Sequence, residues 1–325
     1  MMYDNRMDRQ QQQPPRVAIL GAGAMGSIFG AELASHGVDT LLVDVSTELV
    51  DHLNREGIAL SHAGAARRVP VPATTSPDGE PPADAVIVFV KCWATDDALS
   101  LAGSLIGDET LVLSLQNGLG NGERIAQRVD PMRVLVGVTY HSGTVAGLGE
   151  VEHTVLGTTY IGAHAGANPS VAATLAAQLS AAGLATEATD DVVGRVWRKV
   201  LLNVAANPVA ALTGLHSGAL VEEPHIAALM EALTYEAVAV ARADGQPFER
   251  AEAVSSVRDA LRAAGPALAS MRQDVVAGRR TEIDVITGAV IAMADRHGLD
   301  VPLNRAIFGL IKGYEAARHG AAVPT

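Results

Sequence analysis

The spacing of hydrophobic positions along this chain changes near residue 187. Before that point, short apolar runs alternate with stretches of helical spacing. The runs cover residues 17–20, 40–43, 85–90, 110–115 and 133–137. Such runs are typical of strands that are buried on both faces of a parallel sheet. The first part of the chain is therefore predicted to be an α/β domain with a doubly wound, mostly parallel sheet.

After residue 187 the strand pattern disappears and only helical spacing continues. Helices are predicted over residues 192–206, 226–243, 251–264 and 281–297. Just before this change, small and polar residues alternate with Val and Leu over residues 143–161, which predicts an antiparallel hairpin at the end of the sheet.

Three segments follow from these patterns. They are a disordered tail over residues 1–15, a domain over 16–188, and an all-helical C-terminal domain over 189–320, with a frayed end from Gly320 to Thr325.

Composition narrows the choice of partner. The formal net charge is -12, which disfavours nucleic acid and anionic membranes as partners because both require a basic face. No apolar run is long enough to span a membrane, and the polar start of the chain lacks a signal peptide. We therefore expect a cytoplasmic protein. The single cysteine, Cys92, excludes an internal disulfide and a thiolate zinc site, and no metal is expected.

A glycine motif directly follows the first apolar run. Gly21, Gly23 and Gly26 form the pattern G-x-G-x-x-G, and Ala24 and Met25 open a stretch of helical spacing. The first glycine permits a tight turn, the second lets a pyrophosphate approach the backbone, and the third lets helix and strand pack closely. The N–H groups at the helix start attract phosphate. This arrangement predicts a Rossmann domain that binds a nicotinamide dinucleotide.

Asp44 ends the second apolar run, near the offset at which an acidic residue binds the adenine ribose. Its carboxylate can accept hydrogen bonds from ribose hydroxyls and would repel a 2′-phosphate. No arginine follows immediately. The residue therefore favours NAD(H), while NADP(H) stays open.

Three polar residues share one face of an otherwise apolar predicted helix. Lys199, Asn203 and Asn207 are spaced by four residues, and Pro208 should kink or end the helix at Asn207. Either the three residues form a solvent-facing stripe or they line a functional surface. A desolvated lysine has a lowered pKa and can act as a general acid.

A second polar cluster lies further along the helical part. Its residues are Ser270 to Asp274 and Thr281 to Asp284. The spacing Thr281-x-x-Asp284 resembles a helix capping box, in which Glu282 would only decorate the first helical turn. The residue pattern does not decide between this interpretation and a functional one.

Taken in order, the motifs resemble those of the ketopantoate reductase family, from Arg16 to about Ala317. They are the glycine motif, Val90-Lys91-Cys92-Trp93, Gln116-Asn117-Gly118, Lys199-x-x-x-Asn203-x-x-x-Asn207-Pro208, Ser270-Met271-x-Gln273-Asp274 and Gly278-Arg279-x-Thr281-Glu282-Ile283-Asp284.

The resemblance implies an NAD(P)-dependent oxidoreductase that reduces the keto carbon of a 2-oxo acid, with ketopantoate of the pantothenate pathway as the leading substrate. It also implies a homodimer, with catalysis between the two domains. The implied roles are general acid for Lys199, support of the developing hydroxyl and of the lysine for Glu282, substrate binding for Asn203, Asn207, Ser270 and Asn117, and cofactor binding for Lys91 and Asn117.

Some residues depart from the family pattern. NADPH-using members usually carry a basic residue at the position of Asp44. Ala269 stands where Asn or Ser is frequent, and Thr287 stands where Asn is common. These changes admit another branched 2-oxo acid or the oxidation of a hydroxy acid. A β-hydroxyacid dehydrogenase and a non-enzymatic NAD sensor are the alternatives on the same architecture.

Overall fold

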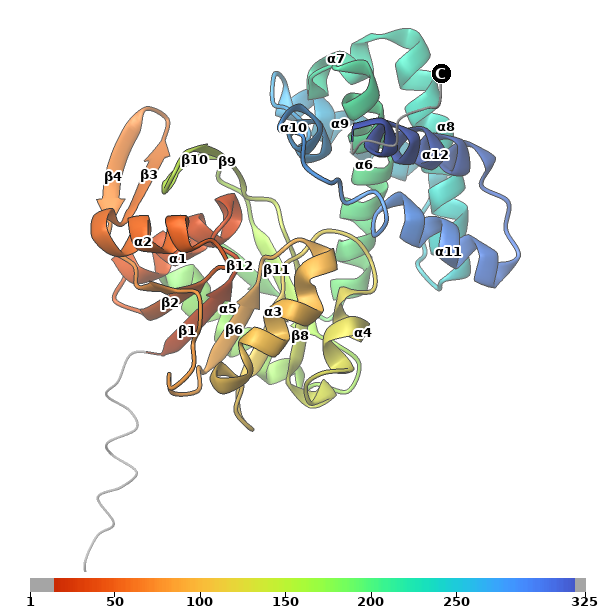
Figure 1. Cartoon of the computed structure of the whole chain (residues 1–325). Helices are drawn as coiled ribbons and strands as arrows, with labels where there is room; N and C mark the ends of the chain where they lie inside the picture. Colours follow the sequence, from red (N-terminus) through yellow and green to blue (C-terminus); the bar gives the residue numbers. More distant parts are fainter. Residues whose placement is uncertain (1–14, 319–325) are drawn as a thin grey trace, which may run out of the picture. The chain divides into compact units, whose positions relative to one another are not determined.

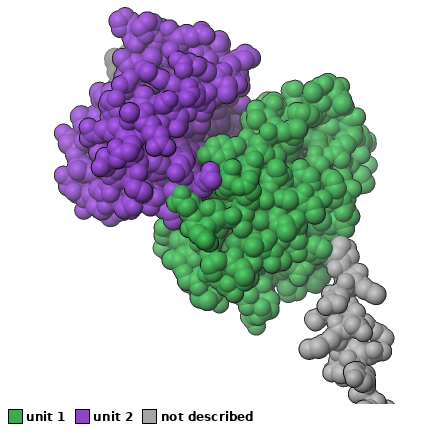
Figure 2. Space-filling model, turned by 180° about the vertical axis from the view of Figure 1, so that it is seen from behind, with its two compact units in different colours: residues 1–116, 121–192 green, residues 117–120, 193–325 purple. Residues whose placement is uncertain are grey.

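The computed structural model describes residues 15–318 (Figure 1). Residues 1–14 of the predicted tail over residues 1–15, and the predicted frayed end from Gly320 to Thr325, lie outside the described residues. The chain divides into two compact units, coloured separately in Figure 2. Unit 1 contains residues up to Gln116 together with Asn121–Val192, and unit 2 contains Asn117–Gly120 and the residues from Val193 onward.

Unit 1 is built on an eight-stranded sheet. In spatial order its strands are β12 (Thr186–Ala188), β11 (Thr159–Ala163), β8 (Val134–Thr139), β7 (Leu111–Ser114), β6 (Ala85–Val88), β1 (Arg16–Leu20), β2 (Asp39–Val43) and β5 (Ala73–Thr74). The strands from β8 to β5 are parallel, whereas β11 pairs antiparallel with β8 and β12 follows the direction of β11. The predicted doubly wound sheet is confirmed.

Alternate residues of each central strand face opposite layers of helices. Val17 and Ile19 of β1 pack into a cluster with residues of α1 (Ala24–Ser35), α2 (Thr47–Glu56) and α5 (Pro169–Ala181). Ala18 and Leu20 pack into another with α3 (Thr95–Leu101) and α4 (Asn121–Ala126). Because both faces are covered, the strands are apolar throughout, which explains the continuous runs in the sequence. Short 3-10 turns lie at Cys92–Ala94, Gly103–Leu105 and Pro131–Arg133.

A second sheet of four strands belongs to unit 1. Its order is β4 (Ala65–Val69), β3 (Ile58–His62), β10 (Glu150–Val155) and β9 (Ser142–Gly147). The predicted hairpin is therefore real, since β9 and β10 pair antiparallel. Its placement at the end of the main sheet was wrong, because β10 pairs with β3 instead. The strands β3 and β4 were not predicted; β4 is exposed and carries two arginines, so it lacks an apolar run.

Two buried histidines meet at this second sheet: His153 belongs to β10, and His141 directly precedes β9. His141 Nδ1 is 2.9 Å from His153 Nε2 and also accepts a hydrogen bond from the Gly157 N–H at 3.3 Å. The ring of His141 also packs edge-on against Phe29 of α1. Burial, together with the smaller effect of His153, lowers the pKa of His141 from 6.5 to about 4.

Unit 2 is helical in its described part. Its helices are α6 (Val192–Thr213, whose first residue is grouped with unit 1), α7 (Ser217–Glu222), α8 (Pro224–Ala243), α9 (Arg250–Ala264), α10 (Ser270–Val276), α11 (Thr287–His297) and α12 (Pro302–Arg318). Trp197 of α6 is fully buried at the centre of one cluster, and its Nε1 donates to Asp244 Oδ2 at 3.1 Å. No helix in the described part of the chain is long and apolar enough to cross a membrane.

The course of α6 corrects one prediction. The helix does not end at Asn207 but continues through Pro208 to Thr213. Proline removes one hydrogen bond from a helix interior. Here Val204, Val209 and Ala210 are almost completely buried, and their packing offsets that loss. Asn207 therefore lies in a regular helix and is buried, at 4% exposure, rather than at an accessible break.

Candidate functional site

The glycine turn of unit 1 has the geometry of a phosphate-binding loop. Gly21 has φ +97°, and a Cβ on Gly26 would lie 1.8 Å from the Gly21 carbonyl oxygen, so both positions require glycine. By contrast, a Cβ on Gly23 would meet nothing within 4 Å. The space beside Gly23 is open at the start of α1, where no side chain caps the first N–H groups. These features fit a bound pyrophosphate.

Asp44 lies directly after β2, next to the glycine turn. Its Oδ2 accepts a hydrogen bond from the Ala22 N–H at 2.8 Å, and its Oδ1 accepts one from the Ser46 N–H at 3.0 Å. The carboxylate is thus held in place by two backbone groups. A partly buried acid at this point matches the predicted place for ribose recognition.

Lys91 follows the strand β6 and precedes the 3-10 turn at Cys92–Ala94. The segment between β6 and Lys91 is held by Gln116, a residue for which the sequence pattern indicated no separate role. Gln116 Nε2 donates to the Val90 carbonyl at 2.7 Å and to Thr95 Oγ1 at 2.9 Å. The only signal for this role was its place in the motif Gln116-Asn117-Gly118.

Unit 2 brings three of the predicted site residues together. Glu282 is buried, at 6% exposure, and its Oε2 accepts a hydrogen bond from Asn117 Nδ2 at 3.1 Å. Lys199 lies on α6, close enough to Glu282 for the carboxylate to act on its charge. Burial lowers the pKa of Lys199 to about 8, while Glu282 opposes that shift. The predicted lowering of the lysine pKa by desolvation agrees with this value.

Asn117 reaches Glu282 because its loop is joined to unit 2. The Leu119 N–H donates to the Val285 carbonyl at 3.1 Å. Gly118 has φ +92°, and a Cβ there would lie 2.3 Å from the same carbonyl oxygen. The close approach of the two backbones therefore requires glycine at this position.

Asn203 and Asn207 follow Lys199 on α6, and both are buried. The Nδ2 group of Asn207 has no hydrogen-bond partner in the described part of the chain. A buried amide without a partner is costly, because desolvation of the donor is not offset. The group is therefore suited to an oxygen atom of a ligand.

Ser270 begins α10 and is exposed. The next residue, Met271, is buried in the cluster that contains Val200 and Leu201 of α6. The helix α10 is therefore anchored against α6 through Met271.

The segment over residues 281–286, which we call the 281–286 turn, corrects a second prediction. Helix α11 begins only at Thr287, so Thr281-x-x-Asp284 is not a capping box. Thr281 Oγ1 instead donates to Glu315 Oε1 of α12 at 2.8 Å. The reason is tertiary: a carboxylate distant in sequence is the hydrogen-bond partner of this threonine. Glu282 accordingly does not decorate a first helical turn.

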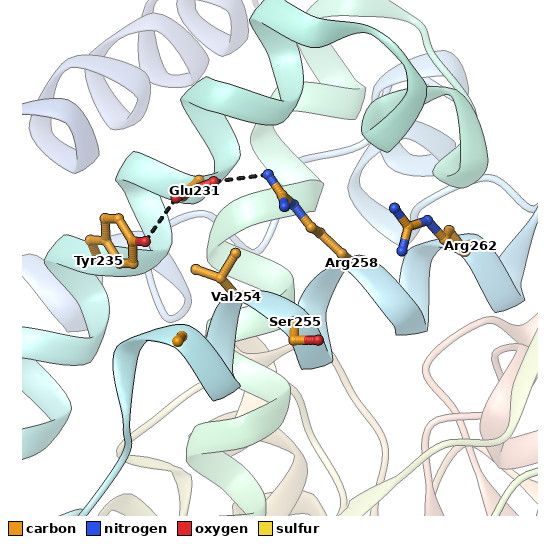
Figure 3. Close-up of a pocket in the computed structure, with 7 residues that line it drawn as sticks. Glu231, Tyr235, Val254, Ser255, Arg258 and Arg262 are labelled. Carbon is orange, nitrogen blue, oxygen red and sulfur yellow. Dashed lines mark hydrogen bonds and ion pairs between the residues drawn. The ribbon is translucent and has the colours of Figure 1, made fainter.

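A surface pocket of about 290 Å³ lies elsewhere in unit 2, on α8 and α9 (Figure 3). Tyr235 and Arg258 both point toward Glu231, which accepts their hydrogen bonds at 2.7 and 2.8 Å. None of the predicted site residues lines this pocket. Within it Arg258 pairs with Glu231, whereas Arg262 pairs with Asp259 outside it. Residues 15–318 also contain no group of three or more His, Cys, Asp or Glu that could hold a metal ion.

Comparison with known proteins agrees with this arrangement. Residues 17–166 match the family described as ketopantoate reductase PanE/ApbA, and residues 191–315 match its C-terminal domain. The chain is 35% identical to a 2-dehydropantoate 2-reductase of Halobacterium salinarum, covering 91% of this chain and 98% of that protein. It is 32% identical to one of Pyrococcus horikoshii, covering 94% and 99%.

Solved structures show the same architecture. A PanE/ApbA family ketopantoate reductase from Ralstonia eutropha is 32% identical with a TM-score of 0.83, covering 94% of this chain and 99% of that one. D-mandelate dehydrogenase with NADH and anilino(oxo)acetate is 26% identical with a TM-score of 0.90 and the same coverage. The predicted fold class and the predicted oxidoreductase class are confirmed, and this chain belongs to the ketopantoate reductase family.

Proposed function

We propose that this protein reduces the keto group of a 2-oxo acid to a hydroxyl group with NADH, and that ketopantoate is its leading substrate. The observation that carries the proposal is the partly buried Lys199 beside the buried Glu282. The lysine pKa of about 8 leaves a proton available at neutral pH. Membership in a family of nicotinamide-dependent reductases supports the reaction class.

The proton transfer follows from these two side chains. A bound nicotinamide supplies the hydride to the keto carbon, which places negative charge on the keto oxygen. Lys199 stabilises that charge and donates its proton to the oxygen. Glu282 then accepts a hydrogen bond from the new hydroxyl group. Because Glu282 also favours the charged form of Lys199, it keeps the general acid protonated before reaction.

Substrate binding is assigned to the asparagines around this pair. Asn207 offers a buried donor that lacks a partner, which suits a carboxylate or hydroxyl oxygen of the substrate. Asn203 and Ser270 are proposed to complete the contacts, and Asn117 and Lys91 to contact the nicotinamide side.

NADH is proposed as the preferred cofactor because of the carboxylate of Asp44. It is held beside the glycine turn by two backbone N–H groups, and the next basic residue in sequence is Arg55. A carboxylate in that position accepts hydrogen bonds from ribose hydroxyls and repels a 2′-phosphate. The similarity to D-mandelate dehydrogenase solved with NADH supports this preference.

The same similarity supports a second candidate substrate, a 2-oxo acid with an aromatic side chain. D-mandelate dehydrogenase was solved with anilino(oxo)acetate, an aromatic amide that resembles a 2-oxo acid in shape and charge. Benzoylformate, the oxo acid that corresponds to mandelate, is therefore the second compound to test.

The deciding experiment measures initial rates with NADH and with NADPH, each with ketopantoate and with benzoylformate. Fast turnover of ketopantoate with NADH supports the proposal in full, and turnover with NADPH alone overturns the cofactor preference. In the reductive direction kcat should fall as the pH rises above about 8, because Lys199 loses the proton that it must donate. If kcat does not fall at alkaline pH, Lys199 is not the general acid.

The remaining expectations are proposals of the same kind. We propose a cytoplasmic homodimer with domain limits at 16–188 and 189–320. Analytical ultracentrifugation of the purified protein would test the oligomeric state.

A further inference from the structure

The last helix, α12, carries two charged residues one turn apart, Lys312 and Glu315. The family motifs described above end before them. The Glu315 side chain is only 11% exposed although it is charged. A buried carboxylate requires hydrogen bonds or an ion pair to offset its lost hydration.

Those partners come from the start of the 281–286 turn. Glu315 Oε1 accepts hydrogen bonds from both the backbone N–H and the hydroxyl of Thr281, each at 2.8 Å. Thr281 is itself almost completely buried, at 1% exposure. These two hydrogen bonds fix the position of the Thr281 backbone and the orientation of its side chain at the start of the turn.

Lys312 connects the same helix to the other end of the turn. Its Nζ is 3.1 Å from Glu315 Oε2 and 3.2 Å from Asp284 Oδ2. Arg280 pairs with the same Asp284 at 3.1 Å. The carboxylate of Glu315 and the ammonium of Lys312 therefore hold the residues on both sides of Glu282.

Glu282 itself accepts a hydrogen bond from Asn117 Nδ2 at 3.1 Å. Within the turn, the Glu282 carbonyl accepts the Val285 and Ile286 N–H groups at 3.2 and 3.1 Å. The position of its carboxylate is thus determined by a loop from early in the sequence and a helix from its end.

We propose that Glu315 is a positioning residue, which holds the 281–286 turn so that the Glu282 carboxylate stays beside Lys199. The inference rests on the proposed function, in which Glu282 supports the general acid. Glu315 acts on Glu282 through Thr281 and the turn.

The test is a double-mutant cycle between Glu315→Ala and Glu282→Gln in the full-length protein. Glu315→Ala should lower kcat by roughly 10- to 100-fold, the size seen for residues that orient a reacting group. The dissociation constant for NADH should change by less than about threefold, because the glycine turn of unit 1 is untouched. The double variant should be no slower than Glu282→Gln alone, because both changes remove the same contribution.

Two readouts separate positioning from a loss of folding. The alkaline limb of the kcat–pH profile should move to lower pH in Glu315→Ala, as in Glu282→Gln, because Lys199 loses a nearby negative charge. Glu315→Gln keeps an oxygen acceptor for Thr281 and should retain more activity than Glu315→Ala. Urea unfolding midpoints show that each variant is folded under assay conditions.

Arg305→Ala is the matched control. It breaks an exposed ion pair with Asp295 between the same helices α11 and α12, without contact to the turn. It should leave kcat and its pH profile unchanged.

The outcomes are distinguishable. If Glu282→Gln is slow but Glu315→Ala is normal, or if their effects multiply, the positioning role is overturned and the proposed function stands. If Glu282→Gln and Lys199→Ala both react at the normal rate, the proposed function fails and the inference fails with it.

Discussion

Two turns of this protein, the glycine turn over residues 21–26 and the 281–286 turn, perform comparable tasks by different means. The glycine turn depends on its own backbone: Gly21 has a positive φ, and Gly26 contacts the Gly21 carbonyl. The 281–286 turn depends on side chains from Asn117 and Glu315, which are far away in sequence. The local geometry of the first turn agrees with its interpretation from sequence, whereas for the second turn the sequence left two interpretations open and the structure excludes the capping box.

The difference has a physical origin. Steric limits on φ and on close backbone approach are local, so they restrict the residue type at each position of the glycine turn. A buried carboxylate, by contrast, accepts hydrogen bonds from donors that only the tertiary fold places nearby, so the local sequence does not identify them. Substitutions in the glycine turn should therefore change stability or NADH binding, whereas substitutions that affect the 281–286 turn should change kcat.

The largest effect on kcat is expected for substitution of Lys199, the residue whose charge is influenced by Glu282 of the 281–286 turn. Lys199→Ala should lower kcat by roughly 10²–10⁴-fold, the usual contribution of a general acid. Lys199→Arg is the matched variant, because it keeps the positive charge but cannot release a proton near neutral pH. Steady-state rates with NADH decide the point, and a Lys199→Ala enzyme at near-normal speed would remove this residue from the mechanism.

The next effect separates two glycines of the first turn. Gly26→Ala places a Cβ 1.8 Å from a carbonyl oxygen, so it should destabilise unit 1 by about 1–3 kcal/mol or more. Gly23→Ala meets no atom within 4 Å and should leave stability unchanged while weakening NADH binding. Thermal unfolding and fluorescence titration with NADH measure the two quantities. An unchanged NADH affinity in Gly23→Ala would contradict a phosphate-binding role for Gly23.

The buried histidines of unit 1 provide a pH-dependent effect of smaller size. In the folded state the pKa of His141 is lowered from 6.5 to about 4, so the unfolded chain binds the proton more strongly. As the pH falls from 6.5 toward 4, protonation of this histidine in the unfolded chain lowers the free energy of unfolding; above pH 6.5 there is no such loss. The loss amounts to at most about 3 kcal/mol.

Urea unfolding at pH 7 and pH 5 should show this loss, and His141→Gln should reduce the difference between the two pH values. The exposed His225 provides the control through His225→Gln. A His141→Gln protein that keeps the full pH dependence would assign the effect to other groups.

The smallest expected change concerns the choice of cofactor. Asp44→Ser keeps a hydrogen-bonding group near the ribose but removes the negative charge. The ratio of kcat/KM for NADH over NADPH should fall by roughly tenfold, equivalent to about 1.4 kcal/mol. An unchanged ratio would show that Asp44 does not reach the ribose.

The parts of the fold that were predictable are those with a local cause. The apolar runs of β1, β2, β6, β7 and β8 indicated a parallel sheet, because both faces of each strand are buried. The spacing of Lys199, Asn203 and Asn207 correctly placed them on one helix. Their catalytic and substrate-binding roles stay predictions.

The parts that were missed depend on distant partners. Pro208 was expected to end α6, but the burial of Val204 and Val209 stabilises the helix through it. The capping box at Thr281 was wrong because helix α11 begins only at Thr287, and the threonine hydroxyl donates a hydrogen bond to Glu315. Gln116 was not singled out, since its hydrogen bond to the Val90 carbonyl exists only in the folded sheet.

The division of the chain has a consequence for protein engineering. Residues Asn117–Gly120 belong to unit 2 although the residues on both sides of them belong to unit 1. A gene truncated to begin at residue 193 would therefore encode the helical unit without the hydrogen-bond donor to Glu282 and without the backbone that contacts Val285. Fragment complementation, domain exchange or circular permutation in this protein must carry that four-residue insertion along with the helices, because a single cut cannot separate the two units.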